Sequence, residues 1–223
     1  MKRLFDITLS ALGLILFSPV LLVLSLCVKV SDGGPIFFRQ ERVGRGGKPF
    51  RIIKFRSMVL NAEKLGLSIT RDHDPRITKI GRLLRKTKLD ELPQLWNVFI
   101  GEMSFVGPRP EVPRYVARYT QHQRKVLELT PGITDLATIQ FRHEEELLAD
   151  AKDPEQFYVD YCMPKKIELN LRYAAKASVW GDLGVIFRTL LACLQPPAQS
   201  AQAPTDTGAA CQAPRRPDPG AEE

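Results

Sequence analysis

The feature that most restricts how this chain folds is an uncharged apolar segment close to the N-terminus. From Ile7 to Val28 the sequence reads ITLSALGLILFSPVLLVLSLCV, which is 22 residues without a charge. A straight helix of this length would measure about 33 Å, enough for a hydrocarbon core of roughly 30 Å. The segment is apolar on every side, which disfavours a buried helix of a soluble domain. We therefore expect it to enter a lipid bilayer.

The centre and the flanks of this segment favour one arrangement in the membrane. No small-x-small cleavage site follows it, which disfavours a signal peptide. Ser18-Pro19 predicts a central kink, because proline lacks an N–H and the serine can bond a freed carbonyl. Lys2 and Arg3 precede the segment and further basic residues follow it, so both ends are expected in the cytoplasm. We predict a re-entrant helix–break–helix over residues 1–30, with a kinked spanning helix as the alternative.

The charge of the whole chain indicates anionic partners. The formal net charge is +7, which suits nucleic acid, acidic lipid headgroups or phosphorylated small molecules. Neither an aromatic-basic RNA-binding stripe nor a recognisable helix-turn-helix is present, so we expect no nucleic-acid partner. The four cysteines form no C-x-x-C pair and the three histidines are scattered, which argues against a zinc site.

The remainder of the chain predicts an α+β domain that is mainly helical. β-Branched and aromatic residues around a glycine-rich turn favour a β-hairpin or two extended pieces between residues 36 and 58. Residues 76–89 form a basic amphipathic pattern, suited to a membrane interface or to packing on the domain's own core. Further helices are expected at residues 112–129, 144–151, 155–177 and 181–194. We expect one catalytic domain over residues 31–195 and a disordered tail over 196–223.

The strongest candidates for chemistry are Asp90 and Glu91. No P-loop, G-x-S-x-G or H-E-x-x-H motif is present in the sequence. Leu92-Pro93 predicts a helix that begins at or near the acidic pair, where the helix dipole would keep a carboxylate ionised. An N-cap role for Asp90 is the alternative. Arg109 lies between two prolines, which fix its backbone and leave its planar fork free for phosphate oxygens.

Four stretches together carry a resemblance to a known family. GPIFFRQERVGRGGKPFRIIKFRSM, DPRITKIGRLLR, LDELPQLWNVFIGEMSFVGPRP and TPGIT resemble, in order and spacing, the bacterial sugar transferases, which are monotopic phosphoglycosyl transferases. The likeness runs from Lys2 to about Thr134. It implies a membrane helix broken at Ser18-Pro19. It also implies transfer of a sugar phosphate from a UDP-sugar to polyprenol phosphate on the cytoplasmic face of the bacterial inner membrane, ahead of downstream glycosyltransferases.

The resemblance also implies roles for individual residues. It makes Asp90 and Glu91 a catalytic dyad, with Mg²⁺ bound at Asp90. Four basic residues match motifs that bind substrate: Lys54, Arg56, Arg85 and Arg109. We expect Asp90 to attack the sugar-bearing phosphate, and Glu91 to position groups or accept a proton. A non-catalytic membrane adaptor is the alternative function.

One stretch departs from the family pattern. Many members continue after PGIT with a glycine and a Q-V-x-G-R run, whereas this chain has Asp135-Leu136-Ala137-Thr138. The departure leaves the identity of the sugar open, more than the chemistry. From its length we expect a minimal catalytic unit without the multi-helix membrane domain of larger relatives.

Overall fold

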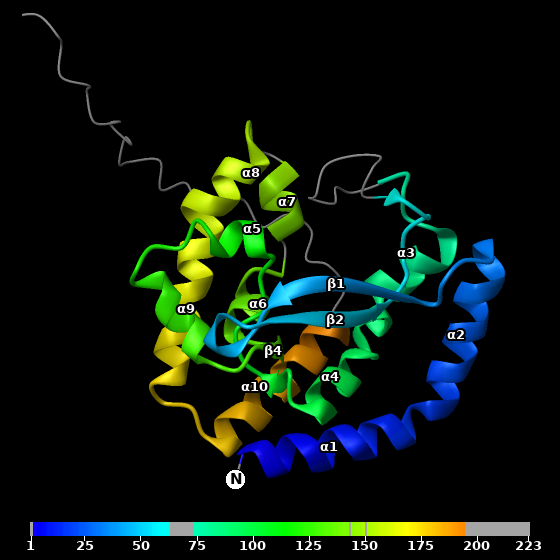
Figure 1. Ribbon diagram of the computed structural model, residues 1–223, viewed down its shortest axis with the longest axis horizontal. Helices are drawn as coiled ribbons and strands as arrows, with labels where there is room; N and C mark the ends of the chain where they lie inside the picture. Colours follow the sequence, from blue (N-terminus) through cyan, green and yellow to red (C-terminus); the bar gives the residue numbers. More distant parts are fainter. Residues whose placement is uncertain (1, 63–73, 143, 150, 195–223) are drawn as a thin grey trace, which may run out of the picture.

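The structure is a computed structural model that describes residues 2–62, 74–142, 144–149 and 151–194 (Figure 1). The α-helices are α1 Lys2–Leu16, α2 Ser18–Asp32, α3 Lys79–Lys86, α4 Gln94–Ile100, α5 Pro113–Val116, α6 Leu136–Gln140, α7 Glu144–Ala149, α8 Pro154–Phe157, α9 Met163–Ala174 and α10 Val179–Leu194. Tighter 3₁₀ turns are η1 Arg45–Gly47, η3 Leu89–Glu91 and η4 Gln123–Glu128, and η5 Tyr158–Cys162 is π-helical. The prediction of a mainly helical α+β fold is confirmed; the predicted tail over 196–223 lies outside the described residues.

Two small sheets complete the fold. β1 Phe37–Val43 and β2 Pro49–Phe55 form an antiparallel hairpin, with Phe37 opposite Phe55 and Val43 opposite Pro49. This confirms the hairpin prediction. Because side chains alternate along a strand, Phe38, Gln40 and Arg42 share one face of the hairpin with Lys54. β3 Ser104–Val106 and β4 Gly132–Thr134 pair in parallel, and so bring the two motifs GPRP and TPGIT together.

The N-terminal apolar segment forms two helices bent by 62° relative to each other. The bend follows Phe17, and the hydroxyl of Ser18 donates to the carbonyl of Ile15 at 2.7 Å. That bond satisfies the carbonyl that the missing N–H of Pro19 leaves free. Among the described helices none is long and apolar enough to cross a membrane alone, whereas α1 and α2 meet that condition as a bent pair. Large apolar side chains stay exposed along both helices: Leu12, Ile15, Leu16, Leu22, Leu26 and Val30.

The charged residues before the apolar segment attach α1 to the rest of the fold. Lys2 forms an ion pair with the buried Asp182 of α10, with Nζ and Oδ2 2.8 Å apart. Arg3 donates to two carbonyls near the end of α4, at 2.6 and 2.7 Å. The carboxylate of Asp6 accepts from the hydroxyl of Ser104 at 3.1 Å and from the next backbone N–H. Lys2 and Arg3 therefore have intramolecular partners; the topological role predicted from their charge stays a prediction.

The predicted helix over residues 112–129 is wrong in one respect, because it is interrupted. α5 ends at Val116 and the helical turn η4 begins only at Gln123. The backbone N–H of Thr120 donates to the side chain of Gln123 at 2.8 Å, and the backbone N–H of Gln123 donates to the hydroxyl of Thr120 at 3.3 Å. This reciprocal pair is a capping box, which starts a new helical segment in place of continuing the old one.

Helix α3 packs on the core of the domain with part of its apolar face. Thr78 caps its N-terminus by accepting from the N–H of Gly81 at 2.9 Å. Leu84 is fully buried and Ile80 packs against the same cluster, whereas Leu83 is 54% exposed. Of the two placements that the sequence allowed for this helix, packing on the core is observed, and Leu83 remains available to a membrane interface.

Candidate active site

Asp90 and Glu91 lie in the short 3₁₀ turn η3, between α3 and α4. Lys88, directly before this turn, adopts a left-handed conformation with φ of 57°. Because α4 begins only at Gln94, the acidic pair precedes that helix and lies outside its first turn. Burial raises the pKa of Asp90, and the nearby cations, Lys54 first among them, oppose that rise. A helical turn begins at the pair, as predicted, but burial has the largest effect on the pKa of Asp90.

Helix α4 and strand β2 fix the position of this turn. The buried side chain of Asn97 accepts from the N–H of Ile53 at 3.1 Å and donates to the carbonyl of Arg51 at 2.9 Å. One amide thus satisfies two backbone groups of β2 and holds α4 against the hairpin. Since Lys54 follows Ile53 on the same strand, this contact places Lys54 beside η3.

Glu91 binds two of the predicted cations at once. Its Oε1 lies 2.8 Å from Nζ of Lys54 and 2.6 Å from Nη2 of Arg109, and its Oε2 lies 3.4 Å from Nη1 of Arg109. Burial alone would raise the pKa of Glu91, but Arg109 and Lys54 outweigh it and hold the pKa well below its usual range. The fork of Arg109, predicted to be free, is engaged by Glu91, although 40% of the side chain remains exposed.

Three hydrogen bonds fix the loop that carries Arg109. The N–H of Gly107 donates to the carbonyl of Thr134, and the N–H of Gly132 donates to the carbonyl of Pro108, both at 3.0 Å. The two glycines are required here, because a Cβ atom on Gly132 would collide with the backbone of Gly107. The third contact involves Asp135, which is buried and accepts from the backbone N–H of Arg109 at 3.1 Å.

Sequence reasoning missed two residues that support this loop. Arg42 was not among the predicted site residues, but it is half-buried and donates from Nη1 to the carbonyl of Pro110 at 3.0 Å. The alternation of β1, which puts it on the same face as Lys54, was the available signal. Asp135 was noted only as a departure from the family pattern. Its side chain caps α6 by accepting from the N–H of Thr138, and an Asp before a helix was the signal for that role.

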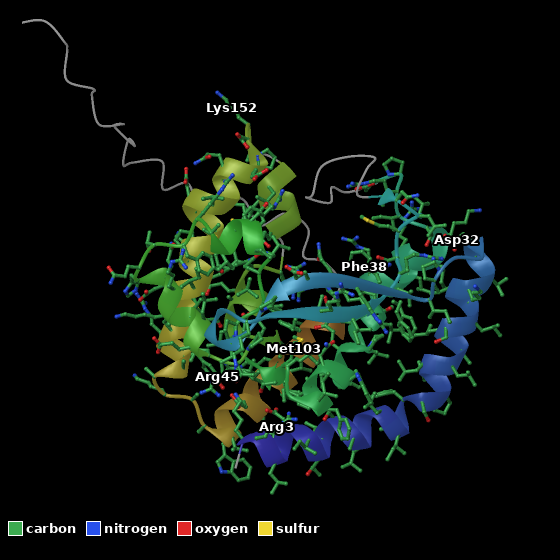
Figure 2. The ribbon with its side chains drawn as sticks, in the orientation of Figure 1. Arg3, Asp32, Phe38, Arg45, Met103 and Lys152 are labelled. Atoms are coloured by element: carbon green, nitrogen blue, oxygen red, sulfur yellow. The ribbon has the colours of Figure 1, made fainter. Side chains whose placement is uncertain are left out.

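The other predicted residues lie in different surroundings. Arg56 is buried and forms an ion pair with Asp32, at the end of α2. Figure 2 labels Asp32 and Arg3 at opposite ends of the bent helix pair. Arg85, near the end of α3, is close enough to lower the pKa of Asp90. The structure therefore brings Asp90, Glu91, Lys54 and Arg109 together with Arg85 nearby, and places Arg56 in a contact with α2 of the bent helix pair instead.

Comparison with known proteins identifies the family of this chain. The model of the family described as "Bacterial sugar transferase" matches residues 1–196. This chain belongs to the bacterial sugar transferase family. The UDP-glucose:undecaprenyl-phosphate glucose-1-phosphate transferase of Escherichia coli K12 is 42% identical over 195 residues, which cover 85% of this chain and 39% of that protein. The enzyme of the same description from Caulobacter vibrioides is 36% identical over 85% of this chain and 68% of its own length.

A third relative is described with a different sugar. The UDP-N-acetylgalactosamine-undecaprenyl-phosphate N-acetylgalactosaminephosphotransferase of Aeromonas hydrophila is 36% identical over 85% of this chain and 42% of that protein. The chain thus spans about two fifths of the length of the Escherichia coli and Aeromonas relatives. Relatives of similar identity are described with different sugars, so similarity alone does not identify a sugar for this chain.

The family implies a magnesium ion, and the residues present fit one. Oδ1 of Asp90 is buried and forms no hydrogen bond within the described part of the chain. Over residues 2–62, 74–142, 144–149 and 151–194 no group of three or more His, Cys, Asp or Glu side chains could hold a metal. Mg²⁺ is commonly bound by one or two carboxylates together with substrate phosphates. A single open carboxylate beside the cations Lys54 and Arg109 fits that mode of binding.

Proposed function

We propose that this member of the bacterial sugar transferase family transfers a sugar 1-phosphate from a UDP-sugar to polyprenol phosphate and releases UMP. The observation that carries the proposal is the unpartnered carboxylate of Asp90 next to the Glu91–Lys54–Arg109 cluster. The descriptions of the relatives, which name UDP-sugars and undecaprenyl phosphate, support the substrate classes. The product would be used by glycosyltransferases that extend a membrane-bound glycan.

The first step is attack by Asp90 on the donor. An oxygen of the carboxylate forms a bond to the phosphorus that carries the sugar, the bond from that phosphorus to the UMP oxygen breaks, and UMP leaves with the electron pair. The enzyme then holds a phosphosugar as an acyl phosphate. Lys54 and the exposed edge of Arg109 offset the negative charge of the diphosphate during attack. Mg²⁺ held at Asp90 would supply further charge neutralisation.

The second step transfers the phosphosugar to the lipid. An oxygen of polyprenol phosphate attacks the phosphorus, and the bond to Asp90 breaks and restores the carboxylate. A phosphate monoester has a second pKa of about 6, so near pH 7 this acceptor is mostly a dianion and needs no base. Glu91, whose pKa is held well below its usual range, is in any case a weak base. We therefore assign Glu91 to positioning Lys54 and Arg109, which was one of its two predicted roles.

We place this chemistry at the cytoplasmic face of the bacterial inner membrane. The bent pair α1–α2 would enter one leaflet and return, with its bend at Ser18-Pro19. Exposed aromatic side chains on α4 and α10, including Trp96 and Trp180, suit the lipid interface. The turn η3, which carries Asp90 and Glu91, lies directly before α4, so the lipid acceptor could reach these carboxylates from the membrane surface.

Release of UMP from the donor alone tests the mechanism. Purified enzyme with UDP-sugar and Mg²⁺, but no lipid, should release about one UMP per enzyme and gain the mass of a phosphosugar on Asp90. Asp90→Asn should lose both signals, whereas Glu41→Gln, which changes an exposed carboxylate on β1, should keep them. UMP that appears only when both substrates are present would indicate direct transfer in a ternary complex. Lipid binding without any UMP release would favour the non-catalytic adaptor.

A further inference from the structure

Strand β3, which leads directly to Arg109, is bonded to the N-terminal part of α1. Oδ1 of the buried Asp6 accepts from the hydroxyl of Ser104 at 3.1 Å and from the N–H of Phe105 at 3.2 Å. On the other edge of the strand, the N–H of Ser104 donates to the carbonyl of Pro131, just before β4, at 2.8 Å. Backbone N–H groups alternate in direction along a strand, so the N–H of Phe105 points away from β4, and Asp6 satisfies it there.

Lys2 makes a further bond to the same strand. Its Nζ donates to the carbonyl of Val106 at 2.9 Å and lies 2.8 Å from Oδ2 of Asp182. Asp182 is buried in α10, where its carboxylate also accepts from the hydroxyl of Tyr173 at 2.6 Å. Figure 1 shows the N-terminal end of α1 beside the start of α10. The ammonium group of Lys2 is therefore fixed between α10 and the last residue of β3.

The connection from β3 to Arg109 is short and closely packed. Only Gly107 and Pro108 separate the end of the strand, Val106, from Arg109. The ring of Pro108 fixes its φ angle, and a Cβ atom on Gly107 would collide with the carbonyl of Thr130. Closely packed segments transmit a displacement instead of absorbing it. A shift of β3 should therefore move the backbone of Arg109.

We propose that Asp6 and Lys2 are positioning residues for Arg109, which act through β3 and place its guanidinium group for the donor diphosphate. The proposal rests on the proposed function, in which Arg109 offsets the charge of that diphosphate. It gives α1 a second role beside membrane attachment, because the helix that enters the lipid also holds the strand before the phosphate-binding residue. Donor binding then depends on how the N-terminal end of α1 is seated on the fold.

Four variants test the contact between α1 and β3. Asp6→Ala removes both bonds to the strand, and Ser104→Ala removes one of them with little change in volume. Asp6→Asn keeps an acceptor oxygen at the position of Oδ1. Ser10→Ala is the matched control, because Ser10 is fully buried on the same helix but its hydroxyl donates to carbonyls of α1 itself, at 2.6 and 3.1 Å. Initial rates are measured with the UDP-sugar that the wild type uses fastest, and thermal unfolding and membrane flotation verify that each variant is folded and membrane-bound.

Asp6→Ala should lower kcat/KM for the donor about tenfold, since a misplacement of 1 Å can cost roughly 100-fold. Ser104→Ala, which removes one hydrogen bond, should lower it about threefold and provides the test if Asp6→Ala does not fold. Asp6→Asn and Ser10→Ala should stay within about twofold of the wild type. Equal losses for Asp6→Asn and Asp6→Ala would overturn the proposal. Native rates in folded Asp6→Ala and Ser104→Ala, or a tenfold loss in Ser10→Ala, would overturn it as well.

A double variant shows whether Asp6 acts through Arg109. Arg109→Lys alone should lower kcat/KM about 100-fold, because it loses the planar fork. Adding Asp6→Ala to Arg109→Lys should then lower kcat/KM by less than about threefold more, since the group that Asp6 positions is already missing. A purely structural role for Asp6 predicts that the two losses multiply to roughly 1,000-fold. That result would overturn the proposal.

Binding of the UDP-sugar, measured by titration calorimetry, separates this proposal from the proposed reaction. If Asp6→Ala weakens binding in the wild-type background but not in Arg109→Lys, and the wild type releases no UMP, the positioning role stands and the proposed reaction fails. If the wild type releases UMP and the two losses multiply, the reaction stands and the positioning role fails. Absence of any UDP-sugar binding by the wild-type chain would overturn both.

Discussion

Neutral variants of Asp90 and Glu91 should change stability in opposite directions, although the two residues are adjacent. Glu91 is bound by Lys54 and Arg109, so Glu91→Gln leaves two cations without their shared carboxylate. Asp90 is buried with a raised pKa, which means that its charged form costs stability in the folded state. Asp90→Asn removes that cost while it abolishes the proposed nucleophile.

The contacts of Glu91 with Lys54 and Arg109 determine how much Glu91→Gln lowers the free energy of unfolding. At 2.8 Å between Lys54 and Glu91, the gross attraction is about 6 kcal/mol for an effective dielectric constant of 20. Desolvation cancels much of this attraction, and removal of one partner of a buried pair typically costs 3–5 kcal/mol. Because 40% of the Arg109 side chain is exposed, we take the lower end, about 3 kcal/mol. The gain in the free energy of unfolding expected for Asp90→Asn grows with the rise in the pKa of Asp90, by about 1.4 kcal/mol per pH unit.

Thermal unfolding at pH 7 in one detergent measures both effects. A domain of this size shifts by roughly 2–4 °C per kcal/mol, so Glu91→Gln should lower Tm by roughly 6–12 °C. Asp90→Asn should have an equal or higher Tm than the wild type. The contribution of Glu91 is complete above its unfolded pKa near 4.5 and is lost as pH falls through the lower folded pKa, so the deficit of Glu91→Gln should shrink in acid. The penalty from Asp90 instead develops as pH rises from about 3.8 through the raised folded pKa.

The control is Glu41→Gln, which removes an exposed carboxylate from the opposite face of β1 and should leave Tm within about 1 °C. A Glu91→Gln variant as stable as the wild type would show that the cluster does not support the fold. A fall in Tm for Asp90→Asn as large as that for Glu91→Gln would refute the reasoning about burial.

Three further variants test the support of the site and its membrane placement. Arg109→Lys keeps the charge but loses the fork, so kcat/KM should fall about 100-fold, while Arg45→Lys, on the exposed turn η1, should stay within about twofold. Arg42→Met releases the carbonyl of Pro110 and should lower kcat about tenfold with a small change in KM and in Tm; a variant with native kcat would contradict the positioning role. Pro19→Ala should straighten the bent pair and lower activity. A cysteine introduced as Arg3→Cys should then be labelled from outside intact cells only in the Pro19→Ala background.

Local patterns in the sequence were sufficient for the elements that depend on neighbours along the chain. The hairpin was predicted because β-branched and aromatic residues flank a glycine-rich turn. The bend was predicted because Pro19 removes one hydrogen bond, and the structure shows the bend with Ser18 bonding the freed carbonyl. The interruption at Thr120 was missed although its capping box could be read from the spacing of Thr120 and Gln123.

The positions of the site residues depend on contacts between distant segments, which local sequence patterns do not predict. Lys54 is 37 positions from Glu91, and Arg109 is 18 positions from it, so no helical or strand period relates them. The motif that contains both Lys54 and Arg56 predicted one role for both, but the strand ends between them at Phe55. Lys54 turns toward the acidic pair, and Arg56 turns toward Asp32 of the bent helices.

The different roles of the two acidic residues follow from the same geometry. In a 3₁₀ turn successive side chains point about 120° apart, so Asp90 and Glu91 cannot share one environment. Glu91 meets Lys54 and Arg109 directly, and its pKa falls; Asp90 is buried with an unpaired oxygen, and its pKa rises. A carboxylate held by two cations is a poor nucleophile and a weak base, because its lone pairs are engaged. The carboxylate with an unpaired oxygen is the more reactive one, which is why we propose Asp90 as the nucleophile and Glu91 as the residue that positions Lys54 and Arg109.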